Sequence, residues 1–301
     1  MKIRLGTRKS NLAVTQTESV AQLLRAHYPE IEIELVKLST KGDEVLHKPI
    51  GQVGSKGVFV KEIEQALLDR EIDLAVHSMK DMPGDVTPGL CFVNPPEGAD
   101  PRDVLVAKEG LDLSKKDQAF RFGTGSLRRA LQLKLLFPHC ETVPIRGNIE
   151  TRMSKIQSEN LDGVVLAYAG LQRGGYTDRV HSVFSGLDII PAPCQGILAL
   201  QIREDDQDLK DLLAPLTHED TLIRYETERA FQGALDGSCQ TPMGIFTSVQ
   251  GDQMTLIGCF GSEDGQIFVR RGISGFLKDR QALAQTLARE LKEEVDEKRT
   301  C

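Results

Sequence analysis

Strand-like and helix-like patterns alternate through residues 1–215, and this alternation restricts the fold more than any other feature. Segment 31–38 alternates at first between apolar and charged residues, as a partly exposed strand does. Segments 72–76, 104–107 and 163–168 also have the length of strands, and helical periodicities lie between the four segments. The last three are almost wholly apolar, which is typical of parallel strands covered by helices on both faces. The order strand, helix, strand predicts an α/β sheet architecture.

Two segments of this region resemble one another. Residues 4–10 read Arg-Leu-Gly-Thr-Arg-Lys-Ser, and residues 121–129 read Arg-Phe-Gly-Thr-Gly-Ser-Leu-Arg-Arg. Each is typical of a strand that ends in a Gly-Thr turn before a helix. Two interpretations remain open at this point. The similarity is chance, or two α/β lobes each direct the free N–H groups and partial positive charge of a helix N-terminus at one cleft.

The pattern changes after residue 220. A helix is predicted over 221–235, followed by strands at 245–249, 254–260 and 267–271 with glycine-containing turns between them. The last segment repeats aliphatic residues every four positions, as an amphipathic helix does. This part predicts a small α+β domain with a three-stranded sheet.

Composition excludes several classes of protein. The chain has 37 Lys and Arg against 44 Asp and Glu, a net charge of −7, which argues against coating nucleic acid but leaves room for a local basic pocket. No run reaches the length of a membrane span, and the N-terminus lacks the pattern of an export signal. The six cysteines form no CxxC pair and the six histidines no HExxH motif, so we expect no metal site and reduced thiols in the cytoplasm.

Several polar residues follow the predicted strands. Lys80 and Asp81 come shortly after the strand at 72–76, where ligands bind in open α/β sheets, although the two side chains could equally form a surface ion pair. The glycine-rich stretch 40–57 lacks the spacing of a phosphate-binding loop. It is typical either of a flexible surface loop or of a lid that carries Lys56 to an anion.

Basic residues gather near the predicted strand ends. Each one alone is typical of a solvated surface charge, but the set indicates a small polyanionic ligand, since arginine pairs both oxygens of a carboxylate. The set comprises Arg8, Lys9, Lys56, Lys61, Lys80, Arg128, Arg129, Arg146, Arg152 and Arg173. Cys239 lies in a loop between Ser238 and Gln240, which makes it a candidate nucleophile or attachment point.

Six motifs in one order resemble a single known family. They are Thr7–Ser10, Gly54–Glu62, Ala75–Asp81, Gly125–Arg129, Arg146–Asn148 and the loop around Cys239. On these motifs the chain is similar, nearly end to end, to the porphobilinogen deaminases, also called hydroxymethylbilane synthases.

The resemblance implies a fold. We expect two lobes like those of periplasmic binding proteins around a cleft, plus a small C-terminal α+β domain with a three-stranded sheet. Residues 1–98 and 197–216 would form the first lobe with the catalytic aspartate. Residues 99–196 would form the second, with arginine-rich anion sites, and residues 217–301 would carry the cofactor.

The resemblance also implies a chemistry. Cys239 would hold a dipyrromethane cofactor through a thioether, and four porphobilinogen molecules would be added to it one at a time with loss of ammonia. Water would then release linear hydroxymethylbilane. Asp81 matches the family's catalytic aspartate, which would stabilise positive charge on a pyrrole ring. The cofactor-binding positions would be Lys80, Thr124, Ser126, Arg128, Arg129, Arg146 and Gly147, and the substrate-binding positions Arg8, Ser10, Lys56, Phe59, Arg152 and Arg173.

The implied partners are porphobilinogen and the growing oligopyrrole, without nucleic acid or membrane. We also expect a cytoplasmic monomer that hands its product to the next enzyme of the pathway. The chain departs from the family pattern at Ser238, Gly125, Cys194 and Gln201. Of these, Cys194 could be a second reactive thiol. A two-lobed solute-binding protein and an enzyme of phosphorylated metabolites are the competing interpretations, and ammonia release from porphobilinogen separates them.

Overall fold

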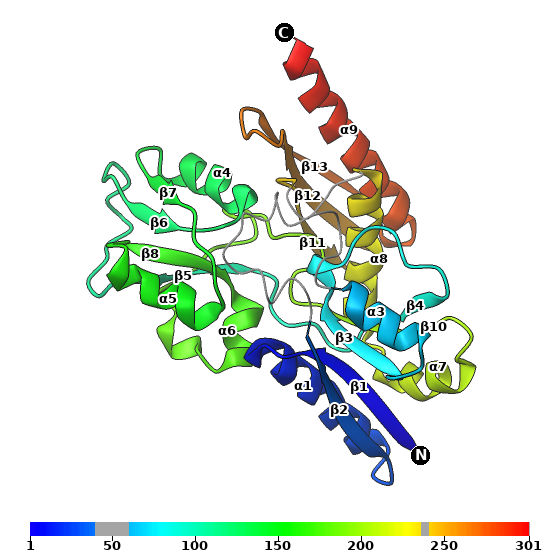
Figure 1. The fold of residues 1–301 in the computed structure, drawn as a ribbon. Coiled ribbons are helices and arrows are strands. Elements are labelled where there is room, and N and C mark those ends of the chain that lie inside the picture. Colours follow the sequence, from blue (N-terminus) through cyan, green and yellow to red (C-terminus); the bar gives the residue numbers. More distant parts are fainter. Residues whose placement is uncertain (40–59, 236–240, 301) are drawn as a thin grey trace. The chain divides into compact units, whose positions relative to one another are not determined.

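A computed structural model describes residues 1–39, 60–235 and 241–300 (Figure 1). Lys56, Phe59, Ser238 and Cys239, and the whole glycine-rich stretch 40–57, lie outside the described residues. The chain forms two compact units. The first is Met1–Gly98 with Gly196–Leu222, and the second is Ala99–Gln195 with Ile223–Cys301. The division into three domains stays a prediction.

The first unit is built on a five-stranded sheet of order β2-β1-β3-β10-β4. Its strands are β1 (Lys2–Arg8), β2 (Glu32–Leu38), β3 (Leu74–Ser78), β4 (Leu90–Val93) and β10 (Leu198–Arg203). The strands β1, β2 and β3 are parallel, whereas β10 is antiparallel to both of its neighbours. The helices of this unit are α1 (Asn11–His27), α3 (Lys61–Leu68) and α7 (Gln207–Leu213), with the 3₁₀ turns η2 (Met79–Asp81) and η4 (Ala214–Leu216). Fully buried aliphatic residues of β1, α1 and β10 form its core.

The second unit contains a five-stranded sheet of order β7-β6-β8-β5-β9. Its strands are β5 (Asp103–Ala107), β6 (Arg121–Gly123), β7 (Glu141–Val143), β8 (Gly163–Ala167) and β9 (Ser182–Val183). Its helices are α4 (Leu127–Leu136), α5 (Ile149–Ser158) and α6 (Tyr168–Gly174), followed by the 3₁₀ turn η3 (Thr177–Arg179). The apolar run of β5 indicated a parallel strand, and this was wrong: β5 is antiparallel to β8 and β9. An apolar run indicates that both faces of a strand are buried, but it does not indicate whether the strand is parallel or antiparallel to its neighbours.

The same unit carries an antiparallel sheet of order β11-β12-β13. Its strands are β11 (Gly244–Gln250), β12 (Gln253–Gly261) and β13 (Phe268–Phe276), with α8 (Glu219–Ala234), the 3₁₀ turn η5 (Leu277–Asp279) and α9 (Arg280–Thr300) beside them. The helix α9 packs against β12 and β13 (Figure 1). The predicted α/β fold with a C-terminal three-stranded sheet is confirmed. No helix among the described residues is long and apolar enough to cross a membrane.

The two five-stranded sheets have the same topology. Each strand that ends in Gly-Thr, β1 or β6, lies between its two parallel neighbours, and an antiparallel strand follows next in the sheet. One polar contact is also repeated. The carboxylate of Asp73 accepts from the backbone N–H of Arg4 at 2.9 Å, and that of Asp162 from the N–H of Arg121 at 2.6 Å. The sequence echo therefore reflects a shared architecture rather than chance.

Candidate active site

Asp81 lies on a short turn at the end of β3. The turn η2 is held by hydrogen bonds from Met79 N–H to the Ile197 carbonyl and from Met82 N–H to the Met79 carbonyl, both 3.0 Å. Met79 and Met82 are each 1% exposed, whereas Lys80 is half-buried and Asp81 is exposed. Two buried anchors thus fix the backbone on either side of the carboxylate, which is the preorganisation that an electrostatic catalyst requires.

Arg8 and Ser10 lie at the same edge of the first sheet. The strands β1 and β3 are parallel, with Gly6 paired to Ala75, so their carboxyl ends meet at one edge. Ser10 caps α1, and its hydroxyl accepts from the N–H of Ala13 at 3.4 Å. This edge therefore carries two of the predicted substrate-binding residues, Arg8 and Ser10, beside Lys80 and Asp81.

A buried polar layer lies behind this edge. His77 is 7% exposed, and burial lowers the pKa of its imidazole to about 4. The nearby Gln201 donates to Glu64 Oε1 at 2.8 Å, and the Thr87 hydroxyl donates to Glu64 Oε2 at the same distance. The imidazole is therefore neutral at neutral pH.

Replacing His77 with glutamine should reduce the acid sensitivity of folding. The imidazole titrates near pH 6.5 in the unfolded chain and near 4 in the folded one, so protons favour unfolding between these values. Stability from this group is present above pH 6.5 and is lost as the pH falls toward 4, by at most about 1.4 kcal/mol per pH unit. Urea unfolding at several pH values measures this. The exposed His139, changed to glutamine, is the control, and an unchanged pH dependence in the His77 variant would contradict the prediction.

Hydroxyl groups follow β6 in the second unit. The Thr124 N–H donates to the Val143 carbonyl at 2.9 Å, which extends the pairing of β6 with β7. Its hydroxyl accepts from the N–H of Ser126 at 3.2 Å, and the Ser126 hydroxyl caps α4. Gly125 lies between them, and a Cβ there would lie 2.6 Å from the Ile145 carbonyl oxygen. Glycine at position 125 thus allows the turn after β6 to lie close to the segment that follows β7.

The loop after β7 carries the next group of predicted residues. Gly147 has a φ of +115°, and a Cβ at this position would lie 2.6 Å from Thr151 Cγ2, so only glycine fits without strain. The carbonyl of Gly147 accepts from Arg152 Nε at 2.7 Å. Arg146 is exposed, and Arg173, on α6, is half-buried with its pKa lowered to about 10 by desolvation.

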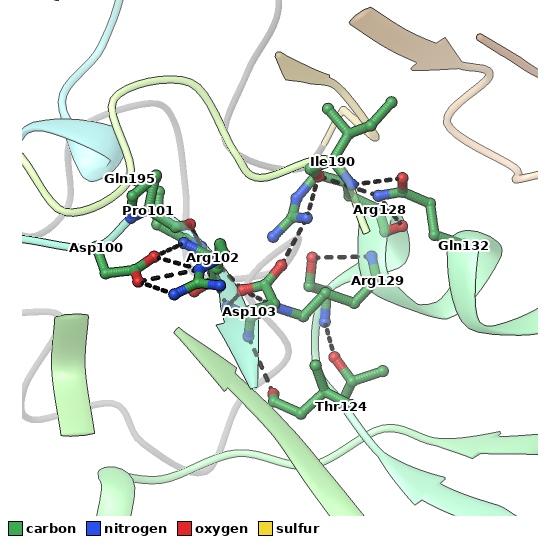
Figure 2. Close-up of polar contacts among 12 residues, drawn as sticks. Asp100, Pro101, Arg102, Asp103, Thr124, Arg128, Arg129, Gln132, Ile190 and Gln195 are labelled. Atoms are coloured by element: carbon green, nitrogen blue, oxygen red, sulfur yellow. Dashed lines mark hydrogen bonds and ion pairs between the residues drawn. The ribbon is translucent and has the colours of Figure 1, made fainter. Parts of the chain in front are cut away.

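Arg128 and Arg129 are not solvated surface charges, and that interpretation was wrong for both (Figure 2). They are 4% and 6% exposed, and each pairs with one oxygen of Asp103, at 2.8 and 2.7 Å. Burial alone would raise the pKa of the Asp103 carboxyl, but the two guanidiniums outweigh it and hold that pKa well below its usual range. Asp103 was not predicted from the sequence, where the one signal for it is a charged residue at the start of an apolar strand.

Comparison with known proteins decides the family. Residues 3–211 match the sequence model of the porphobilinogen deaminase, dipyromethane cofactor binding domain, and residues 222–293 match that of the porphobilinogen deaminase C-terminal domain. The chain belongs to the porphobilinogen deaminase family. The activity of this family is that of hydroxymethylbilane synthase, a transferase of tetrapyrrole biosynthesis that uses porphobilinogen and a dipyrromethane cofactor. The resemblance found in the sequence is confirmed.

Individual relatives agree with this assignment. The porphobilinogen deaminase of Natranaerobius thermophilus is 44% identical over 99% of this chain and 96% of its own length. That of Trichlorobacter lovleyi is 45% identical over 95% and 92%. Among solved structures, the periplasmic aliphatic sulphonate binding protein SsuA from Escherichia coli matches 77% of this chain and 69% of its own, with 14% identity and a TM-score of 0.40.

Cys194 departs from the pattern of the porphobilinogen deaminases, and it is not a reactive thiol. It is fully buried, and burial together with the nearby Glu228 carboxylate raises the pKa of its thiol. Its backbone N–H donates to Glu228 Oε2 at 2.6 Å. The residue has a φ of +59°, a left-handed conformation that favours glycine.

Glycine at position 194 should give a more stable protein than alanine. Alanine retains the left-handed strain, which costs about 1 kcal/mol, whereas glycine relieves it. Denaturant unfolding of Cys194→Gly and Cys194→Ala measures the difference. The same two changes at Cys259, buried in β12 without a positive φ, should give the opposite order. Equal or reversed stabilities at position 194 would refute the argument.

Proposed function

We propose that this chain joins four porphobilinogen molecules head to tail on a dipyrromethane held through a thioether to Cys239, and then releases linear hydroxymethylbilane. The observation that carries this proposal is the edge of the first sheet, where an exposed aspartate on a fixed turn lies beside cations. Asp81 is the catalytic carboxylate, and Arg8, Lys80 and the capped N-terminus of α1 supply positive charge around it.

The residues of the second unit fit a cofactor that carries carboxylates. Each pyrrole ring brings an acetate and a propionate group. Two guanidiniums and one carboxylate meet at Asp103, so this buried cluster keeps a net positive charge that an anion would balance. Groups that follow the carboxyl ends of two parallel strands, β6 and β7, would hold the cofactor with Lys80: Thr124, Ser126, Arg128, Arg129, Arg146 and Gly147. When bound, the dipyrromethane would supply the free α-carbon to which the first porphobilinogen is joined, and the terminal ring of the growing chain would supply it for each later one.

The protein's own side chains would stabilise the developing positive charge and bind the substrate carboxylates. Positive charge develops on the substrate pyrrole as ammonia departs, and the Asp81 carboxylate stabilises it near the ring N–H. The same carboxylate can hold the proton that the leaving amine requires. Substrate carboxylates would bind to Arg8, Ser10, Lys56, Arg152 and Arg173, and Phe59 would contact the ring. The protein thus binds anions with one set of residues and stabilises cations with another.

The test measures ammonia and product together. Purified protein incubated with porphobilinogen should release four ammonia molecules for each hydroxymethylbilane formed, and its intact mass should exceed that of the bare chain before substrate is added. Ammonia without a covalent adduct would contradict the attachment to Cys239. Neither ammonia nor adduct would contradict the proposed function as a whole.

We further propose a cytoplasmic monomer of three domains that passes its product to the next enzyme of the pathway. In the part of the chain that the structure describes, Cys91, Cys140, Cys194 and Cys259 are free thiols, which supports a reducing compartment. Light scattering coupled to size-exclusion chromatography tests the monomer, for which a mass near 33.2 kDa is expected.

A further inference from the structure

Asp103 occupies a particular place at the edge of the second sheet. It is the first residue of β5, and it pairs with Ala167, the last residue of the antiparallel β8. It therefore lies at the carboxyl end of β8, the edge from which Thr124 and Gly147 also follow their strands. Its side chain is fully buried. A buried carboxylate at this edge needs a reason, because burying a charge is costly unless it is paired.

The two oxygens of Asp103 are divided between two neighbouring arginines (Figure 2). Oδ2 lies 2.8 Å from Arg128 Nη1, and Oδ1 accepts from Arg129 Nη2 at 2.7 Å and from its Nε at 3.1 Å. Backbone carbonyls complete the arrangement, since Arg128 donates to Ile190 at 2.5 Å and Arg129 to Val165 at 3.1 Å. Each guanidinium is thus held on two sides.

Gln195 fixes the carboxylate in turn. Its amide Nε2 donates to Asp103 Oδ1 at 2.8 Å and to the Pro101 carbonyl at 2.6 Å. Gln195 is 1% exposed, so this contact is also removed from solvent. A buried network in which each member has partners is rigid. The orientation of both guanidiniums therefore depends on this one carboxylate together with the two backbone carbonyls.

The charges in this cluster do not cancel. Two guanidiniums and one carboxylate leave one positive charge, and the neighbouring Asp100 is already paired with Arg102 at 2.6 Å. Nη1 of Arg128 is engaged by Asp103 and Ile190, while its Nε and Nη2 bind no residue in the described part of the chain. These nitrogens remain for a planar anion, and a carboxylate suits them.

We propose that Asp103 is a positioning residue that sets Arg128, through one ion pair, to receive a carboxylate of the pyrrole chain. This inference rests on the proposed function, and it adds a residue that does not itself touch the ligand. Asp103 acts through Arg128, and Gln195 acts through Asp103.

Asp103→Asn is the primary test because it changes one contact and keeps the shape. The amide oxygen can still accept from Arg129, but the amide nitrogen would face Arg128 Nη1, donor against donor. Arg128 then loses its orientation toward the pyrrole chain that each porphobilinogen must join. The KM for porphobilinogen should therefore rise about tenfold, the effect of losing one charge-assisted hydrogen bond, with a smaller change in kcat. Intact mass first establishes that the assayed protein carries its cofactor.

Asp73→Asn is the matched control. Asp73 also pairs with two arginines, Arg4 at 2.8 Å and Arg203 at 3.3 Å, but it precedes β3 and so lies at the opposite end of its sheet. We expect both Asp73→Asn and Asp103→Asn to lower the midpoint of thermal unfolding. Only Asp103→Asn should raise the KM for porphobilinogen. Equal KM values in the two variants would reduce Asp103 to a structural role and overturn the proposal.

A double-mutant cycle tests whether Asp103 acts through Arg128. In an Arg128→Gln background, Asp103→Asn should change the KM less than twofold, because the group that it positions is gone. Additive effects would overturn the proposal.

Should Asp103→Asn fail to fold, Gln195→Met tests the proposal instead. This variant keeps the charges of Asp103, Arg128 and Arg129, and its KM for porphobilinogen should rise about threefold. An unchanged KM there would overturn the proposal. A wild-type protein that releases no ammonia refutes the proposed function instead.

Discussion

Serine in place of Cys239 should yield a protein without covalent dipyrromethane and without turnover. A thiol becomes a strong nucleophile when it ionises near neutral pH, whereas a serine hydroxyl without an activating base does not. The intact mass of the variant should equal that of the bare chain, before and after exposure to porphobilinogen. The colour reaction of an acidic aldehyde reagent should likewise be absent. The expected loss is complete, because a chain without its primer has nothing to extend.

Cys91→Ser is the control for this change. Cys91 is a half-buried thiol in β4, and we place it in the core packing of the first unit. Its removal should leave both the covalent adduct and the turnover. An adduct that persists in Cys239→Ser would show that another residue holds the cofactor. The buried thiols of Cys194 and Cys259, whose pKa values burial raises, are poor candidates for that role.

Local patterns predicted most of the fold. An alternating segment corresponded to β2, strand-length apolar runs to β3, β5 and β8, and the three C-terminal candidates to β11, β12 and β13. Bounds shifted by a few residues, as for β3, which extends to Ser78 and so includes His77. The direction of β5 could not be predicted, because direction depends on how the chain returns to the sheet and not on the residues of one strand.

The candidate site was predicted only in part. Positions at strand ends identified Arg8, Lys80, Thr124 and Arg146, since carboxyl ends of parallel strands collect at one edge. Burial of Arg128 and Arg129 could not be predicted, because their counter-ion Asp103 is distant along the chain, 26 residues from Arg129. Sequence patterns report local periodicity, whereas an ion pair between β5 and α4 exists only once the sheet has formed.

Asp81→Ala should lower kcat by about 100-fold or more, which is the order of effect of losing one preorganised electrostatic group at a developing charge. The reason lies in the turn that holds it. Met79 and Met82 are buried on either side, so the backbone of η2 survives loss of an exposed side chain. Folding and the covalent cofactor should therefore persist, and the loss should fall on the chemical step.

The comparison with Asp85→Ala separates catalysis from net charge. Asp85 is an exposed carboxylate four residues beyond Asp81, so both variants lose one negative charge from the same segment. Asp85→Ala should retain nearly full turnover of porphobilinogen. Asp81→Glu keeps the charge but moves it by one methylene, and since the turn does not shift to compensate, we expect an intermediate kcat. Near-normal turnover in Asp81→Ala, in protein whose mass includes the cofactor, would assign the stabilisation of the pyrrole cation to another group.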